Sequence, residues 1–182
     1  MATVLLVRHG RTTANATGLL AGRTAGVLLD QIGRDQAAVT GERLAAVPLV
    51  GVVSSPLERC LETAQHIIDR QAGTVLTPIE DELSECDYGD WQGRTLAELS
   101  KEKLWSVVQT QPSAVTFPGG EAMAAMQARS VAAIRRLDAA FEAGIQPPDR
   151  SHRAGLHGGH RLAAGEGHCG RLRLHDRPQL LL

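Results

Sequence analysis

The chain has 182 residues, of which 43% are hydrophobic and 21% are charged, and this suits one globular domain with a core of its own. With 19 Lys and Arg against 20 Asp and Glu, the sequence lacks the excess of cations that sequence-independent binding of nucleic acid requires. It contains no apolar run of about 18 residues, no signal-peptide pattern and too few cysteines for a disulfide framework. We therefore expect a cytoplasmic protein.

Short apolar runs alternate with helical patterns as far as residue 146. Residues 4–7, 49–54 and 74–77 favour strands, because these runs are short, rich in β-branched residues and followed by turn residues. Helices are predicted at 31–46 and at 121–143, and a third begins at Pro56. This alternation favours an α/β fold with a mainly parallel sheet, in which ligands bind at the carboxyl ends of the strands.

The predicted helix that begins at Pro56 carries an arginine in an unusual place. Apolar residues follow one face of this helix at the spacing of a core stripe. Arg59 lies in the first turn, near the positive end of the helix dipole and the carboxyl edge of the sheet. Two interpretations stay open: Arg59 binds an anion there, or it forms a surface ion pair with Glu58 or Glu62.

Three further segments carry residues that could perform chemistry. Arg-His-Gly at 8–10 ends the first strand and presents an imidazole beside a guanidinium, although a chance surface pair has the same pattern. The loop at 82–93 holds four carboxylates, which in most acidic loops are merely solvated, but Tyr88 and Trp91 beside them raise the chance of a partly buried carboxyl for acid–base chemistry. Phe-Pro-Gly-Gly-Glu at 117–121 either lines a ligand pocket or simply begins the next helix.

Taken together, these motifs closely resemble the histidine phosphatase superfamily. The motifs are Val-Arg-His-Gly-Arg-Thr at 7–12, Ser-Ser-Pro-Leu-Glu-Arg-Cys-Leu-Glu-Thr-Ala at 54–64, Leu-Ser-Glu-Cys-Asp-Tyr-Gly-Asp-Trp-Gln-Gly at 83–93, and the run at 117–121. The chain is most similar to the phosphoglycerate mutase-like branch, and within it to actinobacterial phosphomutase-like phosphatases, over residues 1–145. The resemblance implies a three-layer α/β/α fold with a mainly parallel sheet.

The resemblance also implies a catalytic mechanism through a phosphohistidine. His9 aligns with the phosphate-accepting histidine, Arg8 and Arg59 with two arginines that bind the phosphoryl group, and Glu85 with the carboxyl that protonates the leaving oxygen. An attacking imidazole nitrogen must be unprotonated, so we expect the other ring nitrogen to donate to a fixed acceptor such as a carbonyl near Gly10. Guanidinium groups suit the charge that spreads over the phosphoryl oxygens. Such a double displacement needs no metal and no cofactor.

Two further positions concern the substrate. Asn15 aligns with a polar residue that closes the phosphate pocket, and Gly22 lies in the segment 21–23, where the family has a substrate-contacting loop. We therefore expect a phosphatase that acts on a small-molecule phosphomonoester, without a nucleic-acid or membrane partner, and leave assembly as a homodimer open. Two alternatives remain: a phosphoglycerate mutase-type phosphomutase with the same phosphohistidine, and a catalytically impaired remnant.

The sequence changes character after residue 146. Residues 151–182 contain no Val, Ile, Phe, Trp, Tyr, Lys, Thr or Met, hold five of the seven histidines, and predict neither a convincing strand nor an amphipathic helix. We therefore divide the chain into a histidine phosphatase-like α/β domain at 1–146 and a His-, Arg- and Gly-rich tail at 147–182, which is frameshifted or disordered. The C-terminal strand and helix of the family are expected to be missing or altered.

Three interpretations of this tail stay open. The family has a second essential histidine after a core strand, and His157 is the nearest candidate, although the apolar run before it is missing. Alternatively the reading frame is shifted, because codons for 165–172 read one nucleotide later permit Ala-Lys-Ala-Ile-Ala-Asp-Ala-Phe, which resembles the family helix after that histidine. The third interpretation is metal binding by tail residues. Its ligands would come from His152, His157, His160, His168, Cys169 and His175.

Overall fold

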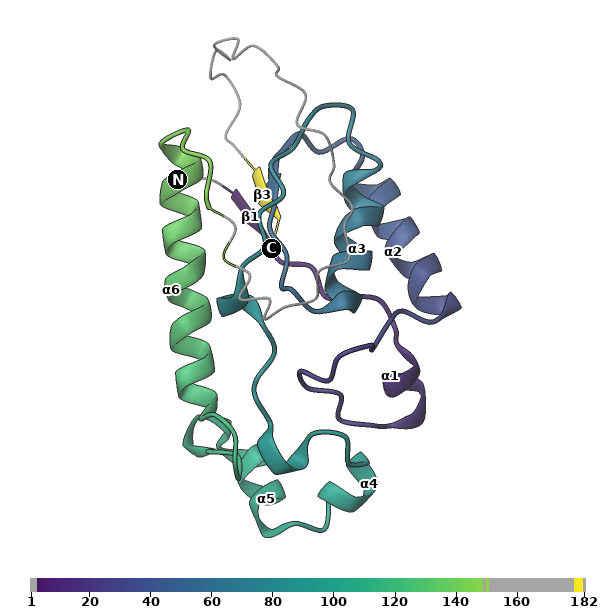
Figure 1. The fold of residues 1–182 in the computed structure, drawn as a ribbon, viewed down its shortest axis with the longest axis vertical. Helices are drawn as coiled ribbons and strands as arrows, with labels where there is room; N and C mark the ends of the chain where they lie inside the picture. The colour runs from purple at the N-terminus through teal and green to yellow at the C-terminus, as the bar shows by residue number, and fades with distance from the viewer. Residues whose placement is uncertain (1–2, 149, 151–178, 182) are drawn as a thin grey trace.

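The computed structural model describes residues 3–148 and 150, together with the backbone of 179–181, and the structural statements below concern these residues. They form three layers (Figure 1). A parallel sheet lies in the middle, with α6 (Met123–Glu142) over one face and α2 (Gln31–Leu44) and α3 (Glu58–Ile68) over the other. The expected three-layer α/β/α fold is confirmed.

The sheet contains β1 (Thr3–Leu5), β2 (Leu49–Val52) and β3 (Gln179–Leu181) in the order β1-β3-β2. All pairs are parallel, and Leu180 is opposite Val4 on one side and Gly51 on the other. The prediction of no strand after residue 150 is therefore wrong for β3. A strand between β1 and β2 satisfies main-chain groups of both neighbours, and this gain outweighs the modest strand propensity of Gln-Leu-Leu.

The strand predicted at 74–77 is only partly present. This segment pairs in parallel with the β2 side of the sheet through two isolated bridges, Gly51 with Leu76 and Ser54 with Ile79. Pro78, which lies between them, has no N–H to donate. The amide of Glu80 then donates to the carbonyl of Ser54 at 2.9 Å. The edge of the sheet thereby leads directly into the loop that carries Glu85.

The two helices on one face position the loop after β1. Asp30 caps α2, because its Oδ1 accepts from the amide of Gly33 at 2.8 Å. A side chain at Gly10 would collide with the main chain of Gly33, and a side chain at Gly33 would collide with the main chain of Arg11. The N-terminus of α2 therefore lies directly against the segment that carries His9.

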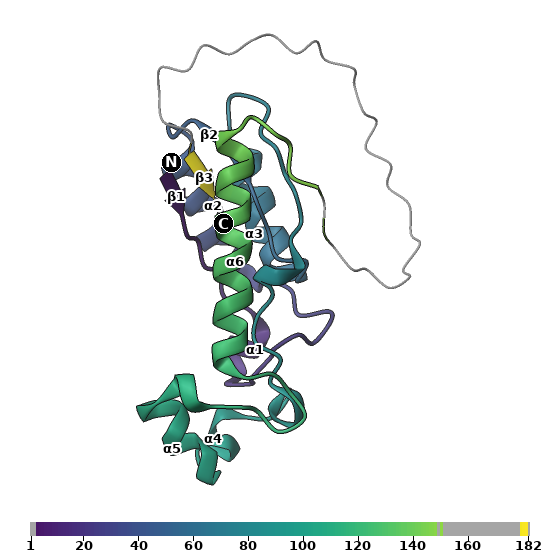
Figure 2. The same ribbon diagram turned by 90° about the vertical axis from the view of Figure 1, so that its left-hand side faces the viewer.

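The core of the molecule is divided among three apolar clusters. Two lie on opposite faces of the sheet, one around Ile67 of α3 and one around Leu137 of α6. The third surrounds Trp91 and packs α5 (Lys103–Thr110) against the turn at 117–121. It lies beyond the end of the sheet, where α4 (Leu96–Leu99) is also found (Figure 2).

The remaining short elements join these parts. They are α1 (Thr13–Thr17) and three 3-10 helices, η1 (Asp81–Leu83), η2 (Gly89–Trp91) and η3 (Pro112–Ala114). No helix in the described part of the chain has the length and apolar character needed to cross a bilayer.

Candidate active site

His9 follows β1 at the carboxyl edge of the sheet. Its Nδ1 contacts the carbonyl oxygen of Gly10 at 2.7 Å, and the amide of Gly10 donates to Thr63 Oγ1 of α3 at 3.2 Å. The expected contact between one ring nitrogen and a carbonyl near Gly10 is confirmed. A proton on Nδ1 leaves the lone pair on Nε2. Burial lowers the pKa of His9, and the neighbouring Arg59 and Arg8 lower it further, so the ring is neutral at neutral pH.

Arg59 connects the histidine with the acidic loop. It exposes only 1% of its surface. Its Nε donates to His9 Nε2 at 3.2 Å, and its Nη2 donates to Glu85 Oε2 at 2.6 Å and to the carbonyl of Gly22 at 2.8 Å. The structure thus brings together His9, Arg59 and Glu85, although they lie far apart in the sequence.

The alternative of a surface ion pair for Arg59 is wrong. Glu58 and Glu62 accept hydrogen bonds from the amides of Gly26 and Leu29. These carboxylates bind the loop before α2, and the guanidinium of Arg59 forms its ion pair with Glu85 instead.

The guanidinium of Arg59 still has one nitrogen without a hydrogen-bond partner. Among the described residues, Arg59 Nη1 is the single buried side-chain nitrogen or oxygen without a hydrogen-bond partner. A buried donor without a partner is unfavourable by about 1–3 kcal/mol, and more when it is charged. Arg59 also lies in the first turn of α3, where the helix dipole adds positive potential. The local chemistry therefore suits an anion that accepts from Nη1.

Glu85 has a donor at each carboxyl oxygen. Arg59 contacts Oε2, and the hydroxyl of Tyr88 donates to Oε1 at 3.1 Å. Burial raises the pKa of Tyr88, so the phenol stays protonated and can donate. The sequence identified Tyr88 only as an aromatic neighbour of the acidic residues. Its separation of three residues from Glu85 was the one available signal for this contact.

Arg8, Asn15 and Gly22 were predicted to lie near the substrate, and the structure positions each of them differently. Arg8 and Asn15 are exposed and line a cavity of about 440 Å³ together with His9 and Glu85. Asn15 Oδ1 also accepts from the amide and the hydroxyl of Thr12, and thereby caps α1. Asn15 therefore lies at the cavity, but its side-chain oxygen already accepts two hydrogen bonds from Thr12.

Gly22 contributes through its main chain. It is absent from the lining of that cavity in the described part of the molecule, and its carbonyl instead accepts from Arg59. Its φ of +54° favours glycine, and a Cβ atom there would approach Gln92 Oε1 to 2.6 Å. Gly22 therefore orients the guanidinium of Arg59.

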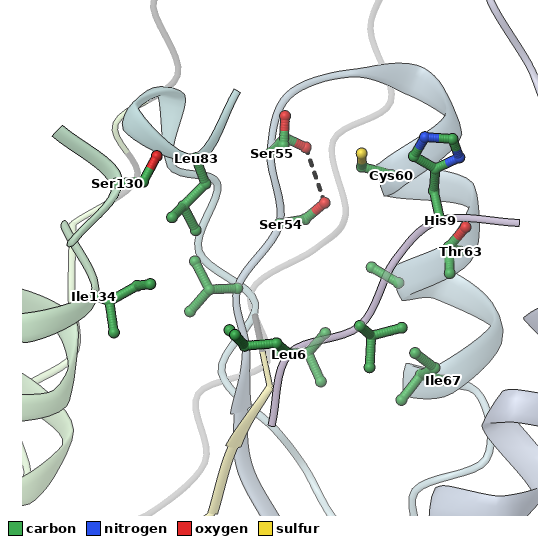
Figure 3. A pocket seen from close by; sticks show the side chains of 14 residues that line it. Leu6, His9, Ser54, Ser55, Cys60, Thr63, Ile67, Leu83, Ser130 and Ile134 are labelled. Atoms are coloured by element: carbon green, nitrogen blue, oxygen red, sulfur yellow. Dashed lines mark hydrogen bonds between the residues drawn. The ribbon is translucent and has the colours of Figure 1, made fainter. Parts of the chain in front are cut away.

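A second cavity, of about 270 Å³, adjoins His9 between α3 and α6 (Figure 3). Its wall is mainly aliphatic, from Leu6 of the β1 side to Ile67 of α3 and Ile134 of α6. Five residues line both cavities: Val7, His9, Ser55, Cys60 and Leu83. His9 consequently stands between two spaces: the first cavity, called the polar cavity below because the charged side chains of Arg8, Arg59 and Glu85 line it, and this second, apolar cavity.

The predictions of a second histidine and of a metal site concern the tail. His157, the candidate second histidine, and all the proposed metal ligands of the tail lie outside the described residues. Within the described residues, no group of three or more His, Cys, Asp or Glu side chains is arranged to ligate a metal ion.

Comparison with known proteins identifies the family. The family model described as histidine phosphatase superfamily (branch 1) matches residues 4–145. The chain belongs to the histidine phosphatase superfamily. Among curated relatives, a Mycolicibacterium vanbaalenii protein named glucosyl-3-phosphoglycerate phosphatase is 33% identical over 135 residues, which cover 74% of this chain and 59% of that protein. Phosphoglycerate mutase-like protein 4 of Arabidopsis thaliana is 34% identical over 140 residues, 75% of this chain and 60% of that protein.

Solved structures of histidine phosphatases share the fold. A putative alpha-ribazole-5'-P phosphatase from Escherichia coli superposes with a TM-score of 0.68 and 29% identity, and the match covers 79% of this chain and 70% of that chain. The native structure of a mycobacterial glucosyl-3-phosphoglycerate phosphatase gives a TM-score of 0.71 at 24% identity, which supports the fold alone, and covers 99% and 72% of the two chains. The chain spans less than two thirds of the two curated relatives described above.

Proposed function

We propose that this histidine phosphatase hydrolyses a small phosphomonoester through a phosphohistidine on His9. The observation that carries the proposal is the contact of Arg59 with both His9 Nε2 and Glu85, while Nη1 of the same guanidinium has no partner among the described residues. Nucleophile, anion-binding group and proton donor thus lie within one hydrogen-bonded unit. The names of the relatives support the same reaction class.

In the first step, His9 Nε2 attacks phosphorus and the P–O bond to the leaving group breaks. Arg59 and Arg8 balance the charge on the phosphoryl oxygens. Glu85 gives its proton to the leaving oxygen, which departs as an alcohol. The alkoxide of an alkyl ester is a poor leaving group, so this step requires Glu85 in its protonated form.

In the second step, water attacks the phosphohistidine. Glu85, now ionised, accepts a proton from the water, the N–P bond breaks, and orthophosphate leaves with the imidazole neutral again. The contact of Nδ1 with the Gly10 carbonyl keeps the ring in one tautomer and one orientation throughout.

A phosphate-release panel on the purified chain tests this function. The panel contains sugar phosphates, phosphoglycerates and glucosyl-3-phosphoglycerate, with His9→Ala as the control. We expect turnover without a bisphosphate activator, an acid-labile phosphoprotein in the native chain, and the loss of both in His9→Ala. Turnover that is unchanged in His9→Ala overturns the proposal, and transfer that requires a bisphosphate activator favours the mutase.

Three further parts of the proposal concern the chain as a whole. We propose a phosphatase-like unit at 1–146, an atypical tail at 147–182, and a cytoplasmic location, which the free thiols of Cys60 and Cys86 support. Sequencing of the gene across codons 146–182 tests the frameshift interpretation. Assembly as a homodimer stays a prediction that light scattering tests.

A further inference from the structure

The carboxylate of Glu121 lies at the centre of a hydrogen-bond network, and Glu121 itself lines neither of the two cavities described above. Its Oε1 accepts from Arg129 Nη2 at 2.6 Å, from the amide of Asp87 at 3.0 Å and from Arg23 Nη2 at 3.1 Å. Its Oε2 accepts from Arg129 Nε at 3.1 Å. One carboxylate thus connects helix α6, the loop at 21–23 and the loop that carries the proposed proton donor.

The same two guanidinium groups also donate to the main chain of Glu85. Arg23 Nε reaches its carbonyl oxygen at 2.8 Å, and Arg129 Nη2 reaches it at 3.2 Å. Arg129 further donates to the carbonyls of Glu82 at 2.6 Å and Ser84 at 2.8 Å. The main chain up to the proton donor is therefore fixed to α6 and to the loop at 21–23.

The positive charges of Arg23 and Arg129 make their common position at the Glu85 carbonyl depend on the negative charge of Glu121. Two guanidinium groups that meet at one carbonyl repel each other unless an anion lies between them. Although burial opposes it, hydrogen bonds from Arg129 and the Asp87 amide lower the pKa of Glu121, so the carboxylate is ionised at neutral pH. The Arg129–Glu121 pair is also largely shielded, with side-chain exposures of 16% and 20%. Screening by solvent is correspondingly weaker than for an open surface pair.

We propose that Glu121 is a positioning residue that fixes the main chain of Glu85 through Arg23 and Arg129. The inference rests on the proposed function, because it assigns Glu121 to the proton transfer that Glu85 performs. The Glu85 side chain is held by Arg59 and Tyr88, whereas its main chain depends on the Glu121 network. A displacement of about 1 Å at a reacting group slows a reaction by up to ~100-fold.

Two esters with different leaving groups test this role in Glu121→Gln. For an alkyl phosphate, whose leaving oxygen needs a proton, we expect kcat/KM to fall about 10- to 100-fold. For 2,4-dinitrophenyl phosphate, whose leaving group needs none, we expect a fall of less than about 3-fold. The value of kcat/KM includes only the steps up to the phosphorylation of His9, so the later hydrolysis of the phosphohistidine does not affect it. Inhibition by orthophosphate should stay unchanged, since Glu121 does not contact His9 or Arg59.

A second measurement does not depend on turnover. Hydrogen–deuterium exchange of a peptide that spans 82–88 should become faster in Glu121→Gln and stay unchanged in Glu102→Gln. This matched control removes the negative charge of the more exposed Arg94–Glu102 ion pair. Equal slowing of both esters, or unchanged exchange at 82–88, overturns the inference. If the native chain cleaves neither ester, the proposed function fails, and the exchange data alone decide the role of Glu121.

Discussion

Two cavities meet at His9, and different forces build them. In the polar cavity, His9, Arg59 and Glu85 are fixed by hydrogen bonds and by an ion pair of 2.6 Å. In the apolar cavity, the side chains of Ile67 and Val52 are fixed by packing, and each residue exposes 2% or less of its surface. Changes on the polar side should therefore alter the reaction, and changes on the apolar side should alter the stability of the fold.

The largest expected effect comes from Arg59→Lys, which separates the two sides most clearly. An ammonium group cannot contact His9, Gly22 and Glu85 together and still offer a donor to a phosphoryl oxygen. We expect kcat/KM for the best ester of the phosphate-release panel to fall about 100- to 1,000-fold, as when one donor to a developing oxyanion is lost. Arg94→Lys, in an exposed ion pair, is the control and should match the native chain. A loss below about 10-fold in Arg59→Lys would show that Arg59 is not the main phosphate-binding group.

Ile67→Ala tests the apolar side. Ile67 exposes 1% of its surface, so its truncation enlarges a cavity that the surrounding helices cannot fill. We expect a loss of about 2–4 kcal/mol in the free energy of unfolding, measured in urea, with unchanged inhibition by orthophosphate. Ile145→Ala, at a residue that is 60% exposed, should cost less than about 0.5 kcal/mol. Weaker phosphate inhibition in Ile67→Ala would contradict the division between the two sides.

Protonation of His9 should affect both the stability of the fold and the rate of the reaction. Its pKa is lowered in the folded chain, so below pH of about 6.5 the unfolded chain binds the proton more readily than the native one. Stability is therefore lost as pH falls, and His9→Asn should lose less between pH 7 and pH 5 in urea titrations. The acidic limb of kcat/KM should likewise lie below pH 6.5, because the neutral ring is the nucleophile. If kcat/KM instead falls with an acidic limb above pH 6.5, this would contradict a neutral and partly buried His9 ring.

The sequence could predict the polar cavity because its chemistry lies in contiguous motifs. His9 and Arg59 each follow a strand of one parallel sheet, and such strand ends meet at one edge. The contacts of Tyr88, Arg23 and Arg129 could not be predicted, because they depend on side-chain directions across loops without periodicity. The strand β3 was missed for a related reason, since its pairing comes from the gap between β1 and β2 and not from its own propensity.

The smallest effect is expected at Cys60, which lines both cavities. Its position beside Arg59 suggests a reactive thiolate, but burial raises the pKa of the Cys60 thiol, and this effect exceeds the opposing influence of Arg59. The thiol is therefore protonated at neutral pH and takes no part in phosphoryl transfer. Cys60→Ser should keep kcat/KM within about 3-fold of the native value, and native Cys60 should react slowly with iodoacetamide at pH 7. A large loss in Cys60→Ser, together with fast alkylation that orthophosphate prevents, would show that the Cys60 thiol takes part in phosphoryl transfer.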